Sequence, residues 1–306
     1  MKYIIGCALL LFSSTIADAC DVCGASSGNQ NLGLLPQMYR HFAGIQYQYN
    51  SFSSTHVPLS DNQPVEYSDE YYRNVQVWGR YCIGRKWQLF AFVPYRYNRS
   101  TYTGQTEPSQ GIGDATLLVN YTFIQTSDSS ESPIQHRLQG GAGIKAPTGS
   151  YKGVSVLEKQ GLPNMQPGTG AWDIPLNLNY TLKYNNTGLN MDCSYNITTA
   201  NRDNYKYGNR LNTQLLAFYW LQGSAVSVLP QIGTRYEYAL HDYDNYNRKW
   251  LNEQTGGYIL SGVAGVQVYY NNIGLQLQYS KPFTQNYGAG NIKAIQRVDA
   301  GLMFLL

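Results

Sequence analysis

The sequence predicts an all-β protein, a 12-stranded antiparallel transmembrane β-barrel. Three observations support this prediction. Apolar and polar residues alternate strictly along many segments, most of these segments exceed ten residues, and their connections alternate between long and short. The composition is consistent with a membrane barrel, because only 13% of the 306 residues are charged while 28 are Tyr. Low charge argues against disordered chains and coiled coils, and no later apolar run is long enough for a membrane helix.

Residues 1–19 have the features of a signal peptide for export. Lys2 precedes an apolar stretch from Ile4 to Phe12 that is too short to span a membrane, and Ala17-Asp18-Ala19 forms an A-x-A cleavage site. Cleavage there makes Cys20 the new N-terminus. Lipoprotein processing at Cys20 is the weaker alternative, because the residue three positions earlier is not the Leu that this signal prefers. Export places the mature chain where disulfides can form.

The mature chain alternates with a period of two. For example, Ile273, Leu275 and Leu277 alternate with Gly274, Gln276 and Gln278. This period indicates strands with one apolar and one polar face. We predict a periplasmic or plug segment over 20–37 and the barrel over 38–306. The twelve predicted strands span 40–52, 70–82, 86–98, 113–125, 134–146, 171–184, 187–200, 209–221, 225–240, 255–270, 273–282 and 293–306.

The connections distinguish a membrane barrel from a soluble sandwich. The long ones include 53–69, 101–110, 147–170 and 241–252, whereas Asn185-Asn186 and Asn271-Asn272 are two-residue turns. Outer-membrane barrels have short periplasmic turns and long external loops, an asymmetry that a sandwich does not need. The prolines mostly avoid strand interiors, as a closed barrel requires. Pro230 is the exception, and we expect a bulge there.

The outward faces are predicted to be apolar with Tyr near the strand ends. Tyrosines of this kind form girdles at membrane interfaces, although Tyr is also simply a good strand former. The predicted girdle residues are Tyr95, Tyr97, Tyr180, Tyr236, Tyr238, Tyr269 and Tyr270. In the last strand, Val298, Ala300, Leu302, Phe304 and Leu306 form one apolar face. Barrel-assembly machinery recognises such a strand, usually with an aromatic last residue, and Leu306 departs from that pattern.

The inward faces are predicted to carry charges of both signs, which fit a hydrated lumen better than a dry core. Two interpretations remain open: a structural ladder of salt bridges, or a polar constriction that selects solutes. They are compatible with each other. Twelve tilted strands give a backbone diameter of roughly 24 Å, so we expect a narrow pore. The predicted pore-lining residues are Arg80, Arg96, Asp114, Arg137, Lys145, Asp173, Asp192, Arg235, Glu237 and Asp299, and Arg297 shares this face.

Cys20 and Cys23 form a C-x-x-C pair at the start of the mature chain. The simplest interpretation is a small disulfide loop or a thiol pair, with a soft-metal site as the alternative. The residue directly after Cys23 is not His, which argues against haem attachment. No second C-x-x-C exists, which argues against a closed zinc site. Cys82 lies toward the same predicted end and is a second candidate for pairing. Cys193 lies on the lipid-facing side and is predicted to be inert.

The sequence carries no catalytic motif, and we predict that the protein is not an enzyme. The four histidines are scattered, without H-x-x-H or H-E-x-x-H, and no G-x-S-x-G occurs. The outer-membrane phospholipase is also a twelve-stranded barrel, with an outward His and Ser two residues apart. His136 faces outward here, but Leu138 stands two residues on. No cofactor is predicted.

Several fragments resemble the bacterial outer-membrane proteins of the MetA-pathway phenol-degradation family. They are Val93-Pro94-Tyr95, Gly111-Ile112-Gly113-Asp114, Lys145-Ala146-Pro147-Thr148-Gly149 and Gln166-Pro167-Gly168-Thr169-Gly170, followed by Asp173 and Tyr180. The resemblance covers about residues 75–180. It implies a barrel proposed to transport small hydrophobic or aromatic compounds. The same fragments have structural explanations as strand ends and turns.

The expected function is passive or facilitated passage of a small solute across the bacterial outer membrane. The alternative is a non-conducting structural, partner-binding or metal-binding barrel, and a phospholipase is a remote third. We expect a monomer whose partners are outer-membrane lipid, barrel-assembly machinery and a small-molecule solute. The net charge of +3, from 22 basic and 19 acidic residues, is too balanced to suggest nucleic acid.

Overall fold

A computed structural model describes residues 41–56, 65–102, 105–126, 133–153, 163–244, 248–252 and 254–306. The predicted signal peptide (1–19) and the predicted plug segment (20–37), with Cys20 and Cys23, lie outside these residues. Within them, no helix is long and apolar enough to cross a membrane.

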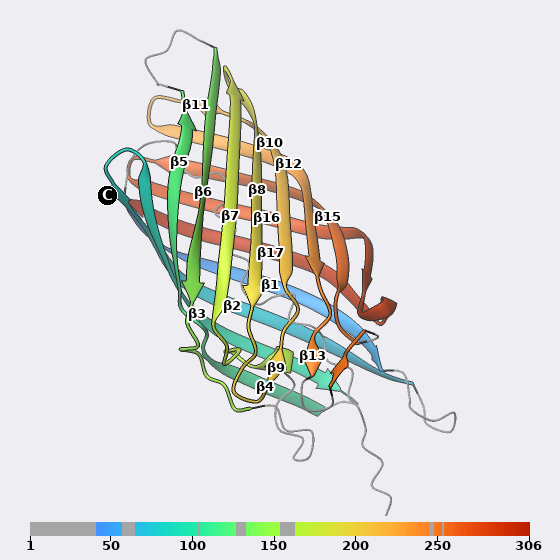
Figure 1. Cartoon of the computed structure of the whole chain (residues 1–306). Helices are drawn as coiled ribbons and strands as arrows, with labels where there is room; N and C mark the ends of the chain where they lie inside the picture. The colour runs from blue at the N-terminus through green and yellow to red at the C-terminus, as the bar shows by residue number, and fades with distance from the viewer. Residues whose placement is uncertain are drawn as a thin grey trace, which may run out of the picture.

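Twelve long antiparallel strands close into a barrel (Figure 1). Each pairs with the next long strand along the chain, and β1 pairs with β17 to complete the circle. The predicted fold class is therefore confirmed. The strands are β1 (Phe42–His56), β2 (Glu66–Ile83), β3 (Trp87–Tyr102), β5 (Thr116–Gln125), β6 (Ile134–Lys145), β7 (Asp173–Tyr184), β8 (Thr187–Thr198), β10 (Arg210–Tyr219), β12 (Val226–Ala239), β15 (Gly257–Tyr270), β16 (Ile273–Tyr287) and β17 (Ile292–Leu305).

Short elements decorate the two ends of the barrel. β4 (Gln105–Ile112) extends the sheet beside β3, and β9 (Tyr205–Lys206), β13 (Tyr243–Asp244) and β14 (Lys249–Trp250) form a small separate sheet. These strands mark the end with the long connections, called here the long-loop end (Figure 1). β11 (Leu221–Gln222) marks the opposite, short-turn end. The 3-10 turns are η1 (Pro163–Met165) and η2 (Gly288–Gly290).

Each predicted strand overlaps an observed one, and the main differences lie at the long-loop end. The prediction of a loop over 101–110 was wrong, because β3 and β4 pair from Tyr95↔Ile112 to Tyr102↔Gln105. Likewise β16 continues to Tyr287, beyond its predicted end at residue 282. Polar residues dominate these extensions, so the apolar alternation that marks membrane-crossing strands does not reveal them.

Pro230 interrupts a hydrogen-bond ladder without forming a bulge. β12 keeps one unbroken register against β15 through Pro230↔Val266. On its other side, pairing with β10 ends at Phe218↔Gln231 and resumes in the same register at Leu221↔Val228 in β11. Proline lacks the N–H that a ladder bond needs, which explains the gap. The expected bulge was therefore wrong.

The tight turns at the short-turn end have the backbone geometry that asparagine tolerates. Asn185 and Asn271 begin the two-residue turns after β7 and β15, with φ of 50° and 49°. Asparagine adopts this left-handed conformation more readily than most residues, and it matches the twist of the flanking strands. The two predicted short hairpins are confirmed.

The side-chain alternation gives the barrel an apolar outer surface. Val77, Leu277 and Ile232 are 57%, 52% and 67% exposed, whereas Gln76 and Gln278 beside them in sequence are buried. Five of the predicted girdle tyrosines are exposed on this surface: Tyr95, Tyr97, Tyr236, Tyr238 and Tyr270. An apolar outer face on a closed barrel is the arrangement that a lipid bilayer requires.

Tyr269 is a correction to the predicted girdle. Its ring packs against buried residues inside the barrel, and its hydroxyl donates to Gln267 Oε1 at 2.9 Å. Tyr269 and Tyr270 are adjacent in β15, and successive side chains in a strand point to opposite faces. Both could not face the lipid.

Candidate functional site: the barrel lumen

The predicted pore-lining residues all point into the barrel. Eight of them are buried, and only Lys145 and Glu237 are partly exposed, with side-chain exposures of 13% and 15%. They do not form one cluster. Arg235, Glu237 and Asp299 meet in one network, and Asp114, Lys145 and Asp173 meet in another. Arg80 and Arg137 lie toward the short-turn end.

An ion-pair network crosses the lumen between β12 and β17. Arg235 Nη1 lies 3.3 Å from Asp299 Oδ2, and the side chains are 1% and 3% exposed. Arg297 Nε lies 2.9 Å from Asp299 Oδ2, and Arg297 Nη1 lies 3.4 Å from Glu237 Oε1. Asp299 thus accepts from two guanidinium groups, and with Glu237 the network holds two cations and two carboxylates. This arrangement matches the predicted structural ladder.

Buried amides continue the network around the wall. Gln278 Nε2 donates to Gln231 Oε1 at 3.2 Å, and Gln214 Nε2 donates to Gln278 Oε1 at 3.3 Å. On β7 and β8, Asn179 Nδ2 donates to Asp192 Oδ2 at 2.9 Å. The middle of the lumen is therefore lined by charges and amides that hold one another in fixed positions.

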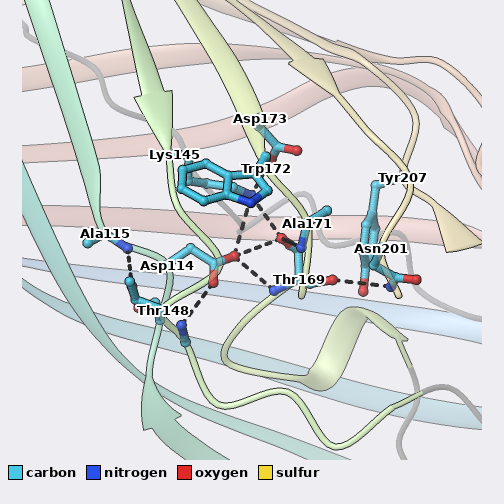
Figure 2. A network of polar contacts seen from close by, with 12 residues as sticks. Asp114, Ala115, Lys145, Thr148, Thr169, Ala171, Trp172, Asp173, Asn201 and Tyr207 are labelled. Carbon is cyan, nitrogen blue, oxygen red and sulfur yellow. Dashed lines mark hydrogen bonds and ion pairs between the residues drawn. The ribbon is translucent and has the colours of Figure 1, made fainter. Parts of the chain in front are cut away.

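Asp114 is the centre of the second network, at the long-loop end (Figure 2). Its Oδ1 accepts from Gly149 N at 3.0 Å, and its Oδ2 accepts from Thr169 N and Oγ1 at 2.8 and 2.7 Å. Lys145 Nζ lies 3.5 Å from Asp114 Oδ2 and also pairs with Asp173. One carboxylate therefore fastens two parts of the connection between β6 and β7.

Three of the four fragments that carry the family resemblance meet at this network. Asp114 ends one of them, the second runs from Lys145 to Gly149, and the third from Gln166 to Gly170. Gly149 and Gly168 touch through their backbones, because a Cβ on Gly149 would lie 2.8 Å from Gly168 Cα. These motifs therefore have a structural role beyond ending strands and forming turns. Their residues make the close contacts that hold one loop in place.

That loop folds into the barrel, contrary to the prediction of a long loop over 147–170 lying outside it. Residues 163–169 are all buried, and we call 163–170 the inner loop. Asn98 Nδ2 donates to Met165 O and Tyr207 OH donates to Pro163 O, both at 2.8 Å. Residues 163–170 show no periodicity from which this inward path could be inferred.

Met165 reaches the opposite wall of the barrel. It packs in a buried cluster with side chains of β1, β2, β12, β15, β16 and β17, namely Phe52, Tyr72, Ala239, Ile259, Tyr287 and Ile292. The inner loop begins between β6 and β7, on the far side of the closed sheet from β1 and β17. It therefore crosses the lumen and narrows it.

A further polar cluster joins the loop that follows β6 to the loop that follows β8. Tyr151 OH donates to Asp203 Oδ2 at 2.7 Å, and Asn201 Nδ2 donates to Tyr151 OH at 2.7 Å. Burial, and then the bond to the Asp203 carboxylate, raise the pKa of Tyr151 above its usual value. Tyr151 therefore stays protonated as a donor through neutral pH.

An aromatic cluster lines the lumen near the short-turn end, and the sequence did not predict it. Its buried members are Phe42, Trp78, Phe90, Phe92, Leu118, Met303 and Leu305, with Tyr269 packed against them. Trp78 and Phe92 stack with ring centroids 6.0 Å apart. We call this group the aromatic cluster. Strand parity was the signal that could have revealed it, since these side chains share the inward face.

Other residues considered above lie away from the lumen. His136 faces outward, and its Nδ1 is 2.7 Å from Tyr180 OH, which also faces outward. Cys193 lies on the outer side, where Thr213 Oγ1 is 3.6 Å from its sulfur. Among the described residues, no group of three or more His, Cys, Asp or Glu side chains is placed to hold a metal ion.

The chain matches no protein-family profile and no curated protein by sequence. Its fold does match solved structures. An outer membrane channel from Pseudomonas putida F1 aligns over 90% of this chain and 100% of its own, with 13% identity and a TM-score of 0.64. The NanC porin aligns over 85% and 100%, with 12% identity and a TM-score of 0.42. The TodX monoaromatic hydrocarbon channel aligns over 88% and 90%, with 10% identity and a TM-score of 0.40.

The likeness to the Pseudomonas channel spans almost the whole chain, so the barrel fold implied by the family resemblance is confirmed. The chain is a twelve-stranded antiparallel β-barrel with an apolar outer face, and it shares its fold with an outer membrane channel.

Proposed function

We propose that the protein is an outer-membrane channel through which a small solute passes passively or by facilitated diffusion. One observation carries this proposal: a closed barrel with an apolar outside encloses a lumen lined by charges and amides. Outer-membrane barrels that conduct solutes have polar interiors of this kind. The structure with the same fold from Pseudomonas putida F1 is itself described as an outer membrane channel.

In this proposal the path of the solute through the lumen is narrow, and it is restricted at two places that differ in chemistry. The inner loop restricts the long-loop end through Met165, and the network of Arg235, Asp299 and Arg297 narrows the middle. Ion pairs that brace the wall also present fixed charges to a passing solute. The two earlier interpretations, structural ladder and selective constriction, describe the same residues. The predicted pore-lining set keeps this role as part of the proposal.

The aromatic cluster supports a solute with an apolar portion. Aromatic walls bind apolar groups by burial and ring contacts, while the amides nearby supply hydrogen bonds. The family resemblance implies small hydrophobic or aromatic compounds, which agrees with this lining. We propose no catalytic role, because the outward His136 has a tyrosine hydroxyl as its hydrogen-bond partner and no serine two residues away.

A non-conducting barrel is the alternative, and the deep burial of the lumen side chains favours it. Arg235 is only 2% exposed, and Asn120 is completely buried. In that case the N-terminal segment with Cys20 and Cys23 would serve as a plug or bind a partner or metal. We also propose that the barrel is a monomer recognised by barrel-assembly machinery through β17, whose Phe304 faces outward.

Solute flux into proteoliposomes tests the channel proposal. The folded full chain is expected to admit small uncharged solutes at a rate that falls steeply as solute size increases. A variant lacking residues 20–37 separates the two candidates. Faster flux in this variant indicates a plugged channel. Flux no greater than in protein-free liposomes, for both forms, contradicts the channel proposal and favours the non-conducting barrel.

A further inference from the structure

Arg80 joins the aromatic cluster to the polar part of the lumen. Its guanidinium carbon lies 5.1 Å from the centroid of the Phe42 ring, and the residue is 2% exposed. Across the β2–β3 pair, Arg80 is directly opposite Phe90, which is also buried. A charged group and a continuous ring-lined surface therefore meet at one place.

A second arginine lies near this place. Arg137, on β6, is buried and shares the inward face of its strand with Gln139, which accepts a hydrogen bond from Gln88, the residue diagonally across from Arg80 in the β2–β3 pair. Two guanidinium groups in one part of a lumen attract an anion more strongly than either would alone.

Buried amides with unused hydrogen-bonding capacity connect the two arginines. Gln88 Nε2 donates to Gln139 Oε1 at 3.2 Å, and Gln139 shares the inward face of β6 with Arg137. Gln88 pairs in register with Asn120 on β5. Asn120 is completely buried, and neither its amide nitrogen nor its oxygen has a hydrogen-bond partner in the part of the chain that the structure describes. A buried amide normally has partners, so Asn120 is suited to bind a ligand.

Glycines in the neighbouring strands make room for two of the rings of the aromatic cluster. Trp78 lies over Gly44, where an added Cβ would come within 3.2 Å of Trp78 Nε1 and 2.4 Å of a backbone oxygen. Tyr269 lies over Gly274, where an added Cβ would be 2.9 Å from the ring. Glycine therefore lets both rings lie against the wall of the barrel, which gives an apolar group a surface to stack on.

We propose that this part of the lumen is a binding site for small organic anions that carry an apolar body. The carboxylate or sulfonate group would bind between Arg80 and Arg137, because guanidinium groups pair with such oxyanions through two parallel hydrogen bonds. The apolar body would lie against Phe42, Phe90 and Trp78, and Asn120 would contribute polar contacts. This proposal rests on the proposed channel function, of which it specifies the solute class.

Tryptophan fluorescence of the folded full chain measures binding directly. The probes are benzoate, benzyl alcohol and acetate, which separate the contribution of the charge from that of the ring. Benzoate is expected to change the fluorescence at the lowest concentration. Trp78→Phe should abolish the change, whereas Trp87→Phe, at an exposed position on β3, should preserve it. Equal affinities for benzoate and benzyl alcohol would overturn the proposed anion site.

Variants of the two arginines test the site itself. Arg80→Gln and Arg137→Gln should each weaken benzoate binding by about tenfold or more and change benzyl alcohol binding little. Arg80→Lys, which keeps the charge, should lose less. Arg73→Gln is the matched control, because Arg73 lies between the outward rings of Tyr49 and Tyr97. Folding of each variant is checked by the gel shift between boiled and unboiled samples.

The same preparations distinguish failure of this site from failure of the channel. Solute flux without selective benzoate binding retains the channel and rejects the anion site. Selective benzoate binding without flux retains the site and rejects the channel. Unchanged benzoate affinity in both folded glutamine variants also rejects the site, whatever the flux.

Discussion

Tyr269 and Tyr270 are neighbours in β15 and face opposite sides of the barrel wall. This pair shows how far the type of a single residue predicts the face of the barrel on which it lies. Tyr suits a membrane interface, a strand and a lumen equally well, so residue type alone does not give its direction. Its position in the alternation along the strand does determine the direction, because successive side chains point to opposite faces. The charged lumen residues could be predicted because charge is excluded from the lipid face, whereas the aromatic cluster could not be recognised by type.

The effect of replacing Asp299 can be predicted from its contacts. Its carboxylate accepts hydrogen bonds from Arg297 and Arg235, and all three side chains are buried. Asp299→Asn leaves two buried cations without this counter-charge. We expect the free energy of unfolding to fall by about 3 kcal/mol, as urea titration of the barrel in lipid vesicles would measure.

Asp69→Asn is the matched control, because Asp69 is exposed on β2. We expect this change to alter the free energy of unfolding by less than about 0.5 kcal/mol. If Asp299→Asn has an effect as small as the control, the network of Arg235, Asp299 and Arg297 does not stabilise the lumen.

The elements differ in how far the sequence determines them. A strand such as β8 was predicted to within about two residues, because apolar and polar side chains alternate along its length. The inner loop was not predicted, since glycine, proline and short polar residues have no period that indicates a direction. Its inward path depends on distant partners, chiefly Asp114 on one side and the cluster around Met165 on the other.

Asp114 is therefore expected to control how firmly the loop between β6 and β7 is held. Asp114→Asn removes the charge that pairs with Lys145 and one acceptor for Thr169 and Gly149. Charge-assisted hydrogen bonds contribute about 1.5–3 kcal/mol each. We expect trypsin to cut after the exposed Lys152 about tenfold faster in this variant, as limited proteolysis of the folded barrel would measure.

Asp69→Asn again provides the control, because it removes a carboxylate far from this loop in the sheet order. Its cleavage rate at Lys152 should equal that of the unmodified chain. Equal rates in the Asp114→Asn variant would show that the carboxylate does not anchor the loop.

At the scale of the whole molecule, one simple rule is repeated around the closed sheet. Each long strand presents apolar side chains to lipid and polar or aromatic ones to the lumen, and β1 meets β17 without leaving an edge. The closure and the strand number followed from periodicity and from the alternation of connections. The constriction did not, because it arises from contacts between segments far apart in the sequence.

Single-channel recording in planar bilayers tests the central claim, a lumen that conducts and is narrowed by the inner loop. We compare the full chain with Met165→Ala and with Met191→Ala, a matched change at an exposed position on β8. The account predicts a small conductance in the full chain, a larger one in Met165→Ala and no change in Met191→Ala. An identical conductance in all three, or none in any correctly folded form, would contradict it.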